Sequence, residues 1–237
     1  MSLPKKQILP FISNENLYKH VRKVLETAQQ ASDLAGENLH SNVVDPFSAL
    51  FDALRQEISL TDWVDQEKTR QIQKTMQNAL GEFHQAIIGS MDGWEDLPVG
   101  HIIDDRNMKR KIITEIKNKH NTTKGSDKKS IYDNLNSQLK GDYKGFTGYY
   151  VEIIPKGKRP YDKPFTPSDN VSRKRRPINE KIRVIDGRSF YALASGHKDA
   201  LKTLYTVLPE VISDILGIDC QNIIKDTLFM DLFNRAY

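Results

Sequence analysis

The sequence predicts an α/β or α+β fold, in which helices flank a central mixed sheet and a helical N-terminal portion precedes it. Two observations lead to this prediction. Residues 1–90 carry apolar residues at helical spacing, whereas strand-like and helical segments alternate in residues 91–237. We expect residues 1–90 to pack on a core formed by residues 91–237, giving one compact domain overall.

Three helices are expected in the N-terminal portion. The first follows from "ENLYKHVRKVLETAQQASDLA", whose apolar residues recur at helical intervals. The second begins at "DPFSALFDALRQ", where Asp45 is a suitable N-cap and Pro46 fits the first helical position. The third covers residues 65–90 and has an apolar stripe on one side.

The pattern changes after residue 90. Residues 99–119 are typical of a β-hairpin with its tip near residues 106–109, and a helix follows that ends before Gly141. "GFTGYYVEIIP" predicts a third strand. Residues 156–179 contain four prolines and are expected to form a loop. A short strand, a turn at Asp186 and Gly187, and C-terminal helices complete the order.

Composition narrows the class of protein. Of the 237 residues, 38% are hydrophobic and 28% charged, as in an ordinary globular protein. No apolar run approaches the ~20 residues that cross a bilayer, so no membrane partner is expected. Cys220 is the sole cysteine, which excludes an intrachain disulfide and a cysteine-cluster metal site. The N-terminus has no signal-peptide pattern, and a cytoplasmic protein is expected.

Basic charge is concentrated in two parts of the chain. We call residues 109–129 the first basic segment and residues 156–176 the second. Together they hold 16 of the 35 Lys and Arg residues but 4 of the 31 Asp and Glu residues. Such concentration indicates a polyanion partner. Two solvated lysine-rich loops are the alternative interpretation.

The second arm of the predicted hairpin carries an unusual pair of charges. Residues two apart on a strand share a face, so Glu115 and Lys117 project together from an otherwise apolar strand. Asp104 and Asp105 lie on the neighbouring arm, within reach of Glu115. Two carboxylates and a lysine around one point favour Mg²⁺ binding and phosphate chemistry. A surface ion pair on an edge strand is the alternative.

Asp104, ten intervening residues and then "EIK" resemble the signature of PD-(D/E)XK nucleases. The longer string "EIKNKHNTTKG" is more specific. Together with "NVVDPFSALFDAL", "NALGEFHQAIIGS", "YYVEIIPK" and "IRVIDGRSFYAL", it is similar to type II restriction endonucleases, particularly those that cut GGNCC or GGWCC sites. The resemblance spans roughly residues 42–204.

This resemblance implies a PD-(D/E)XK core and Mg²⁺-dependent cleavage of both strands of a short palindromic DNA duplex by a homodimer. It also implies a cognate DNA methyltransferase in the same system. Carried over residue by residue, Asp104 and Glu115 are metal ligands, and Lys117 is the base or stabiliser that orients water. Helices that precede the hairpin in this superfamily often add an acid, which makes Glu82 a candidate auxiliary ligand.

The first metal ligand departs from the family pattern. With a three-residue hairpin loop, His101 would stand opposite Glu115, in place of the usual acid. Three interpretations remain open. Asp104 reaches in from a neighbouring position, Asp105 does so through a bulge, or the acid has been replaced and metal binding is altered.

Candidate DNA-binding residues lie in both basic segments and in one later turn. The stretch after the catalytic strand offers donors for phosphates or base edges beside a helix N-terminus, and "SRKRRP" offers cations suited to guanine or to phosphates alone. Arg188 is exposed by the turn "DGRS". The full set is Asn118, Lys119, His120, Asn121, Thr122, Lys124, Arg173, Lys174, Arg175, Arg176 and Arg188.

Two rival functions use the same residues. A structure-specific or repair nuclease would share Glu115 and Lys117 but would not need base-reading loops. A catalytically inactive DNA-binding protein would use Glu115 only as an ion-pair partner of Lys117. The long basic loop after residue 155 favours sequence readout, and hence a restriction enzyme.

Overall fold

The computed structural model describes residues 3–35, 44–98, 100–169 and 173–237. The chain forms two compact units. One unit is Val21–Glu82, and the other joins the chain up to His20 with Phe83–Tyr237. This division differs from the boundary expected at residue 90. The last turns of the third predicted helix bury Phe83, Ile87 and Ile88, so they belong with the second unit.

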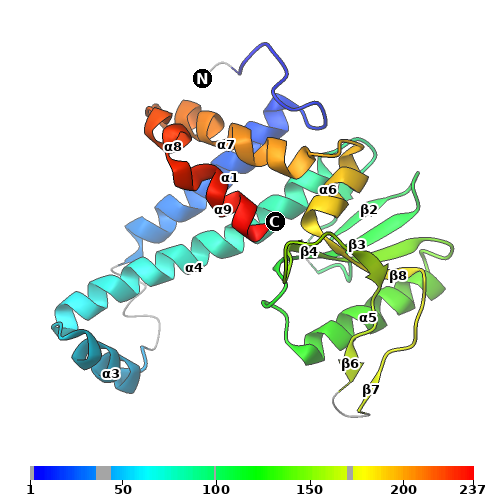
Figure 1. The fold of residues 1–237 in the computed structure, drawn as a ribbon, viewed down its shortest axis with the longest axis horizontal. Helices are drawn as coiled ribbons and strands as arrows, with labels where there is room; N and C mark the ends of the chain where they lie inside the picture. The colour runs from blue at the N-terminus through cyan, green and yellow to red at the C-terminus, as the bar shows by residue number, and fades with distance from the viewer. Residues whose placement is uncertain (1–2, 36–43, 99, 170–172) are drawn as a thin grey trace. The chain divides into compact units, whose positions relative to one another are not determined.

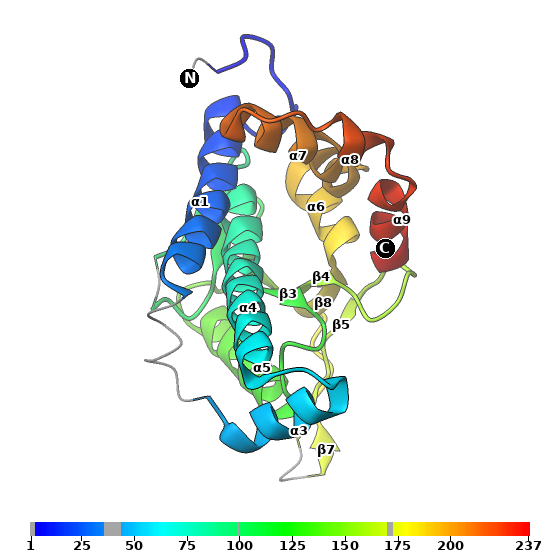
Figure 2. The ribbon, with the colours of Figure 1, turned by 90° about the vertical axis from the view of Figure 1, so that its left-hand side faces the viewer.

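The unit Val21–Glu82 is helical. It contains most of α1 (Asn14–Asp33), all of α3 (Pro46–Gln56) and most of α4 (Leu60–Gly89). The predicted cap of α3 is confirmed, since the Asp45 side chain accepts hydrogen bonds from the backbone N–H groups of Phe47 and Ser48. Figure 2 shows α3 beside the first turns of α4, where Ala49, Ala53 and Trp63 form a small apolar cluster.

The second unit is built on a mixed sheet, as predicted. The described residues form a six-stranded sheet in the order β1-β2-β3-β4-β8-β5, with β3, β4 and β8 parallel and the other neighbours antiparallel. Figure 1 shows these strands. Their bounds are β1 (Glu95–Asp96), β2 (Asp105–Asn107), β3 (Ile112–Lys119), β4 (Thr147–Ile154), β5 (Asp162–Pro164) and β8 (Ile182–Asp186).

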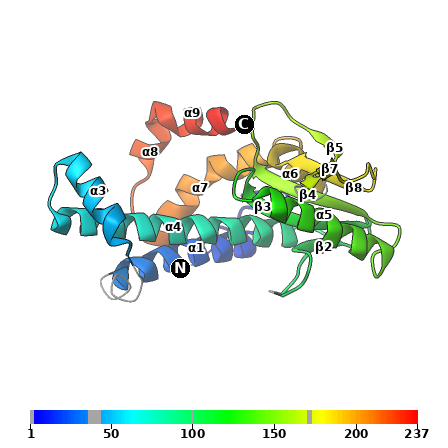
Figure 3. The ribbon, with the colours of Figure 1, turned by 90° about the horizontal axis from the view of Figure 1, so that it is seen from below.

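Helices cover both faces of this sheet. On one face lies α5 (Gly125–Lys140), which approaches β4 so closely that a Cβ at Gly148 would meet Leu135 at 3.2 Å. On the other face lies α6 (Gly187–Ser195), whose Phe190 packs against Tyr149 of β4. Figure 3 shows α5 and α6 on either side of the strands. The chain ends in α7 (Ala200–Leu216), α8 (Gln221–Lys225) and α9 (Thr227–Ala236).

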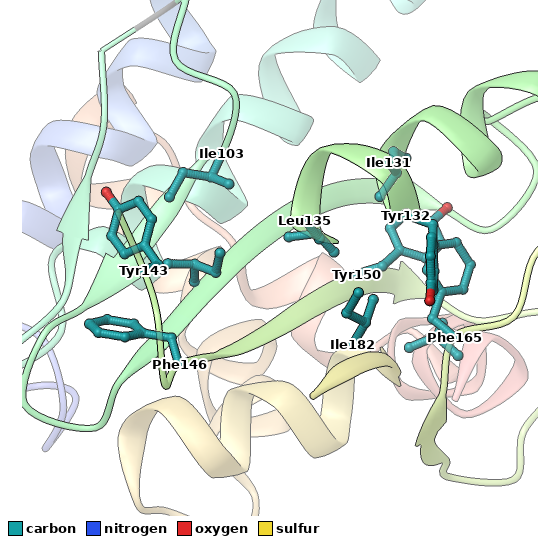
Figure 4. Close-up of a cluster of buried hydrophobic side chains, with 11 residues drawn as sticks. Ile103, Ile131, Tyr132, Leu135, Tyr143, Phe146, Tyr150, Phe165 and Ile182 are labelled. Atoms are coloured by element: carbon teal, nitrogen blue, oxygen red, sulfur yellow. The ribbon is translucent and has the colours of Figure 1, made fainter. Parts of the chain in front are cut away.

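The hydrophobic core under α5 determines which side chains of β3 point toward that helix. Ile131 and Leu135 of α5 pack with Ile113 of β3, Tyr150 of β4 and Ile182 of β8, and Figure 4 shows this cluster between helix and strands. Residues two apart on a strand share a face. Glu115 and Lys117 therefore lie on the same face as Ile113, beyond the end of the apolar cluster.

The loop predicted for residues 156–179 was wrong in part. It contains β5, which pairs with β8 at the sheet edge, and a two-stranded ribbon of β6 (Ser168–Asp169) and β7 (Lys174–Arg175). Proline is tolerated on edge strands because one side of the strand needs no hydrogen bond. Pro164 at the end of β5 is such a case. Residues 170–172 lie outside the described residues.

The hairpin is confirmed, but its tip was misplaced. The pairs Asp105–Thr114, Arg106–Ile113 and Asn107–Ile112 leave Met108–Lys111 as the turn, rather than residues 106–109. Lys111 closes the turn in the left-handed conformation, with φ 55°. Because the turn lies further along the chain, the register shifts, and Asp104 directly precedes the Asp105–Thr114 pair. Val99, in the expected first arm, lies outside the described residues.

No helix among the described residues is long and apolar enough to cross a membrane.

Candidate active site

Strand β3 presents Glu115 and Lys117 at the polar end of its α5-facing side. Lys117 Nζ lies 2.7 Å from Glu115 Oε1, and the two side chains are 35% and 16% exposed. The apolar residues that anchor β3, such as Ile113 and Ile116, are fully or almost fully buried. The strand thus holds an acid and a lysine at the border between core and solvent, accessible to a ligand.

Asp104 lies beside this pair. Its Oδ2 accepts a hydrogen bond of 2.6 Å from the backbone N–H of Ile116, which is between Glu115 and Lys117 in sequence. The backbone N–H of Asp104 donates to the Thr114 carbonyl at 2.8 Å. A side-chain hydrogen bond from Gln85 of α4 also reaches the carboxylate. Asp104 is therefore fixed both to the catalytic strand and to the preceding helix.

The charges of the three side chains depend on one another. Burial raises the pKa of the Asp104 carboxyl, although the Ile116 N–H, Lys117 and Gln85 oppose the shift. Burial and the neighbouring Asp104 charge raise the pKa of Glu115, against the effect of Lys117. Burial alone would lower the pKa of Lys117, but Glu115 and Asp104 outweigh it and the pKa is raised. Lys117 is therefore an ammonium group beside two crowded carboxyls.

The donor set fits a divalent cation. Among the described residues no group of three or more His, Cys, Asp or Glu side chains could hold a metal ion, so the protein would supply the two carboxylates of Asp104 and Glu115. Mg²⁺ is commonly bound by one or two carboxylates, with water and phosphate oxygens at the remaining positions. A cation would also relieve the repulsion that raises the pKa of Glu115.

Asp105, the alternative ligand, lies in a different environment. Its side chain is 0% exposed, and neither carboxylate oxygen has a hydrogen-bond partner. It pairs with Thr114, which faces away from Glu115. Burial, with the charges of Asp96 and Asp104, raises the pKa of Asp105 well above its usual value. The structure thus brings Asp104 to Glu115 and Lys117, and places Asp105 on the opposite face.

The expectation that His101 would stand opposite Glu115 was wrong. It assumed a three-residue hairpin loop, whereas the observed turn Met108–Lys111 has four residues and lies further along the chain, which shifts the residue opposite Glu115 from position 101 to position 104. His101 is exposed and lies outside β2, three residues before Asp104. A position that faces Glu115 is therefore occupied by an acid, as the family signature requires.

Glu82 has another partner within its own compact unit. Its Oε2 lies 2.9 Å from Lys23 Nζ of α1, and both side chains are more than 60% exposed. Gln85, one turn further along α4, is the residue that contacts Asp104. No role was predicted for Gln85, although it lies on nearly the same helical face as Glu82. An amide has no charge to mark it as a site residue.

The residues that follow Lys117 form a polar turn before α5, which is half-buried at Asn118, Lys119 and His120 and more exposed further on. Asn118 and Lys119 end β3, His120 donates its backbone N–H to the Ile154 carbonyl, and Lys124 precedes the helix. Asn121 and Thr122 are exposed between them. This group begins directly after Lys117, at the end of β3, and continues to the start of α5.

The predicted cations of the second basic segment separate into two kinds. Arg173, Lys174 and Arg175 are exposed on the β6–β7 ribbon. Arg176 instead forms ion pairs with Asp133 at 2.6 Å and Asp169 at 3.6 Å. Arg188, exposed in the first turn of α6, donates to the Tyr237 carbonyl at 3.2 Å.

Comparison with known proteins shows the family of the chain. Residues 9–217 match the family model described as Eco47II restriction endonuclease. The chain is 40% identical to the type II restriction enzyme Eco47II of Escherichia coli over 237 residues, covering 97% of this chain and 99% of the relative. It is 29% identical to the type II restriction enzyme Sau96I of Staphylococcus aureus over 235 residues, covering 96% and 89%. The chain therefore belongs to the Eco47II restriction endonuclease family.

Proposed function

We propose that this restriction endonuclease makes Mg²⁺-dependent double-strand cuts at a short palindromic G/C-rich DNA site of the GGNCC type. The reaction is the attack of an activated water on the phosphodiester. The observation that supports the proposal is the convergence of Asp104, Glu115 and Lys117 within hydrogen-bonding contact of one short stretch of β3. The relatives are named type II restriction enzymes, which favours site-specific cleavage over repair of damaged DNA.

Asp104 and Glu115 would hold the cation. When bound, a divalent cation lowers the pKa of its water and neutralises charge that develops on the phosphate. Ile116 fixes the orientation of Asp104 through its N–H, and Gln85 supports the same carboxylate. These contacts keep the two acids in place before DNA arrives.

Lys117 orients the attacking water and stabilises the phosphate. Its raised pKa means that it enters the reaction as an ammonium group, which donates hydrogen bonds but cannot yet accept a proton. Its observed partner is Glu115. If Glu115 held a cation, it would give up this ion pair, and Lys117 would then be able to turn toward the substrate.

DNA binding is assigned to the polar groups near this site. Asn118, Lys119, His120, Asn121, Thr122 and Lys124 would contact the backbone around the scissile phosphate, because they continue the catalytic strand. The exposed Arg173, Lys174 and Arg175 are suited to guanine edges or to phosphates. Arg176 and Arg188 would act mainly by holding their own segments, since both have protein partners.

We infer a homodimer from the symmetry of the target. Each chain has one Asp104–Glu115–Lys117 set among its described residues, and a palindromic site presents two equivalent strands. A two-fold symmetric pair of chains matches that symmetry. The host would need a cognate DNA methyltransferase to protect its own sites, and the shared substrate places both proteins in the cytoplasm.

Plasmid digestion with Mg²⁺ tests the proposal. Discrete fragments whose sequenced ends share one palindromic G/C-rich motif are the expected result. Smearing, or cutting confined to junctions, would identify a structure-specific or repair nuclease. Binding in Ca²⁺ without cutting in Mg²⁺ would identify a DNA-binding protein without catalysis.

A further inference from the structure

Strand β4 carries a buried acid next to the catalytic lysine. Glu152 pairs in parallel register with Lys117 of β3, and its residue is 6% exposed. Paired residues of parallel strands project from the same face, so Glu152 belongs to the face that bears Glu115 and Lys117. A buried carboxylate is costly unless its charge is compensated, and none of the catalytic groups described above compensates it.

Lys128 and Tyr161 bind one oxygen of Glu152 each, and the Tyr150 side chain also forms a hydrogen bond with this carboxylate. Lys128 Nζ lies 2.6 Å from Oε1, and the Tyr161 hydroxyl donates to Oε2 at 2.6 Å. Both bonds are charge-assisted and short, which is typical of strong hydrogen bonds to a carboxylate. Glu152 is thereby turned toward these two residues, while Lys117 is turned toward Glu115.

Lys128 and Tyr161 come from the two basic segments. Lys128 is in the first turn of α5 and belongs to the first basic segment, residues 109–129. Tyr161 directly precedes β5 and belongs to the second, residues 156–176. The two basic segments, which are separate in sequence, are therefore both bound to the carboxylate of Glu152 on β4.

Further contacts hold each segment in the same place. The backbone N–H of Tyr161 donates to Asp186 Oδ2 at 2.7 Å, and Asp186 is the β8 residue paired with Glu152. On the other side, the Tyr150 hydroxyl donates to Thr123 Oγ1 at 3.3 Å, and Lys128 Nζ lies 5.4 Å from the centre of the Tyr150 ring. Tyr150 is the β4 residue paired with Glu115.

We propose that Glu152 is a positioning residue that ties both basic segments to the catalytic strand. Through Lys128 it fixes the start of α5 and the polar turn at residues 118–124. Through Tyr161 it fixes the exposed cations Lys156, Lys158 and Arg159. The two groups are thereby held at a constant distance from Lys117. The part of this proposal that concerns DNA rests on the proposed nuclease function.

Glu152→Gln tests the proposal with little change in shape. The neutral amide removes the negative charge, so the ion pair with Lys128 is lost and the Tyr161 hydroxyl no longer donates to a carboxylate. We expect affinity for a labelled duplex containing GGACC, measured in Ca²⁺, to fall about tenfold, because charge-assisted bonds of this kind contribute on the order of one to a few kcal/mol. The single-turnover cleavage rate at saturating DNA should change much less. Amide hydrogen exchange should become faster in residues 119–129 and 156–161 together.

Partner variants identify the contact responsible. Lys128→Met and Tyr161→Phe should each cause part of the loss of DNA affinity seen in Glu152→Gln. Combined with Glu152→Gln, neither should lower the affinity much further, because the effects of substitutions within one hydrogen-bond network are not additive. Lys129→Met is the matched control. It removes the same charge from the next residue, whose partner is Asp169 at 3.4 Å rather than Glu152. Exchange in residues 156–161 should then stay as in the wild type.

Unchanged DNA affinity and unchanged exchange in Glu152→Gln would overturn the proposal. So would a loss confined to the cleavage rate at saturating DNA, which would place Glu152 in the chemistry. If Glu152→Gln unfolds, Tyr161→Phe decides the same question, since it removes one hydroxyl alone. A wild type that cuts no DNA would refute the nuclease function, whereas hydrogen exchange without DNA would still show whether Glu152 anchors both segments.

Discussion

Asp104 and Asp105 are adjacent in sequence, yet the structure gives them opposite surroundings. Asp104 accepts a hydrogen bond from the Ile116 N–H and lies beside Lys117 and Gln85. Asp105 is fully buried on the other face of the sheet, and its carboxylate oxygens have no hydrogen-bond partner. One residue step along a strand thus separates an acid that lies beside Glu115 and Lys117 from an acid that is enclosed.

The difference shows that surroundings, rather than residue type, decide which acid can bind a cation. A cation needs an ionised carboxylate and room for water. Asp105 lacks that room, because it is fully buried and helix α4 approaches it closely, and burial also raises its pKa well above the usual value. A Cβ at Gly89 would lie 2.8 Å from Asp105 Oδ1. Asp104 has compensating donors and adjoins the partly exposed Glu115 and Lys117.

The largest expected effect concerns the catalytic pair on the Asp104 face. Glu115→Gln and Lys117→Met should each lower the cleavage rate at least about 100-fold, the scale of a lost acid, base or ligand group. Specific DNA binding in Ca²⁺ should be largely retained, since other residues contact the DNA. Full activity in either variant, measured by plasmid cleavage, would exclude this site.

A smaller effect is expected on the Asp105 face, where His84 lies 2.7 Å from the Tyr191 hydroxyl through Nδ1. Burial lowers the pKa of His84 from 6.5 to about 4. Between these values the unfolded chain binds a proton that the folded chain does not. The stability contribution is therefore fully present above pH 6.5 and lost as pH falls through 4. It amounts to about 3 kcal/mol.

Chemical denaturation of the wild type and His84→Gln at several pH values measures this contribution. The wild type should lose more free energy of unfolding between pH 7 and pH 4.5 than His84→Gln does, because only the wild type has an imidazole to protonate. Equal losses in the two proteins would mean that His84 is not held neutral by the fold.

The smallest effect is expected at His101, which the sequence analysis had considered as the residue opposite Glu115. His101→Asp should not raise the cleavage rate, because His101 is exposed and Asp104 already faces Glu115. Steady-state cleavage over a range of Mg²⁺ concentrations checks this. A large gain, or a lower Mg²⁺ requirement, would show that Asp104 is not the first ligand.

The sequence predicted much of the site because strand periodicity is local. The side chains of Glu115 and Lys117 must share a face in any extended strand, and the apolar neighbours Ile112, Ile113 and Ile116 indicated a central strand. The N-cap at Asp45 was predicted for the same reason, since capping depends on adjacent residues.

The partner across the hairpin was harder to predict, because register depends on the turn. The turn Met108–Lys111 lies further along the chain than expected and is one residue longer than a three-residue loop, and Lys111 adopts a left-handed conformation that sequence alone does not reveal. Contacts between distant segments were missed for a different reason. Gln85 with Asp104, and Lys128 with Glu152 and Tyr161, are neighbours only after the sheet and helices have assembled.

The comparison of Asp104→Asn with Asp105→Asn tests the assignment of the site most directly. Both substitutions keep the shape of the side chain, and the two positions are adjacent. Plasmid cleavage in Mg²⁺ measures the activity of each variant, and thermal unfolding checks that each variant is folded. Asp104→Asn should fold and lose cleavage at least about 100-fold, and Asp105→Asn should fold and cut at close to the wild-type rate. Loss of cleavage in Asp105→Asn with activity retained in Asp104→Asn would contradict the assignment.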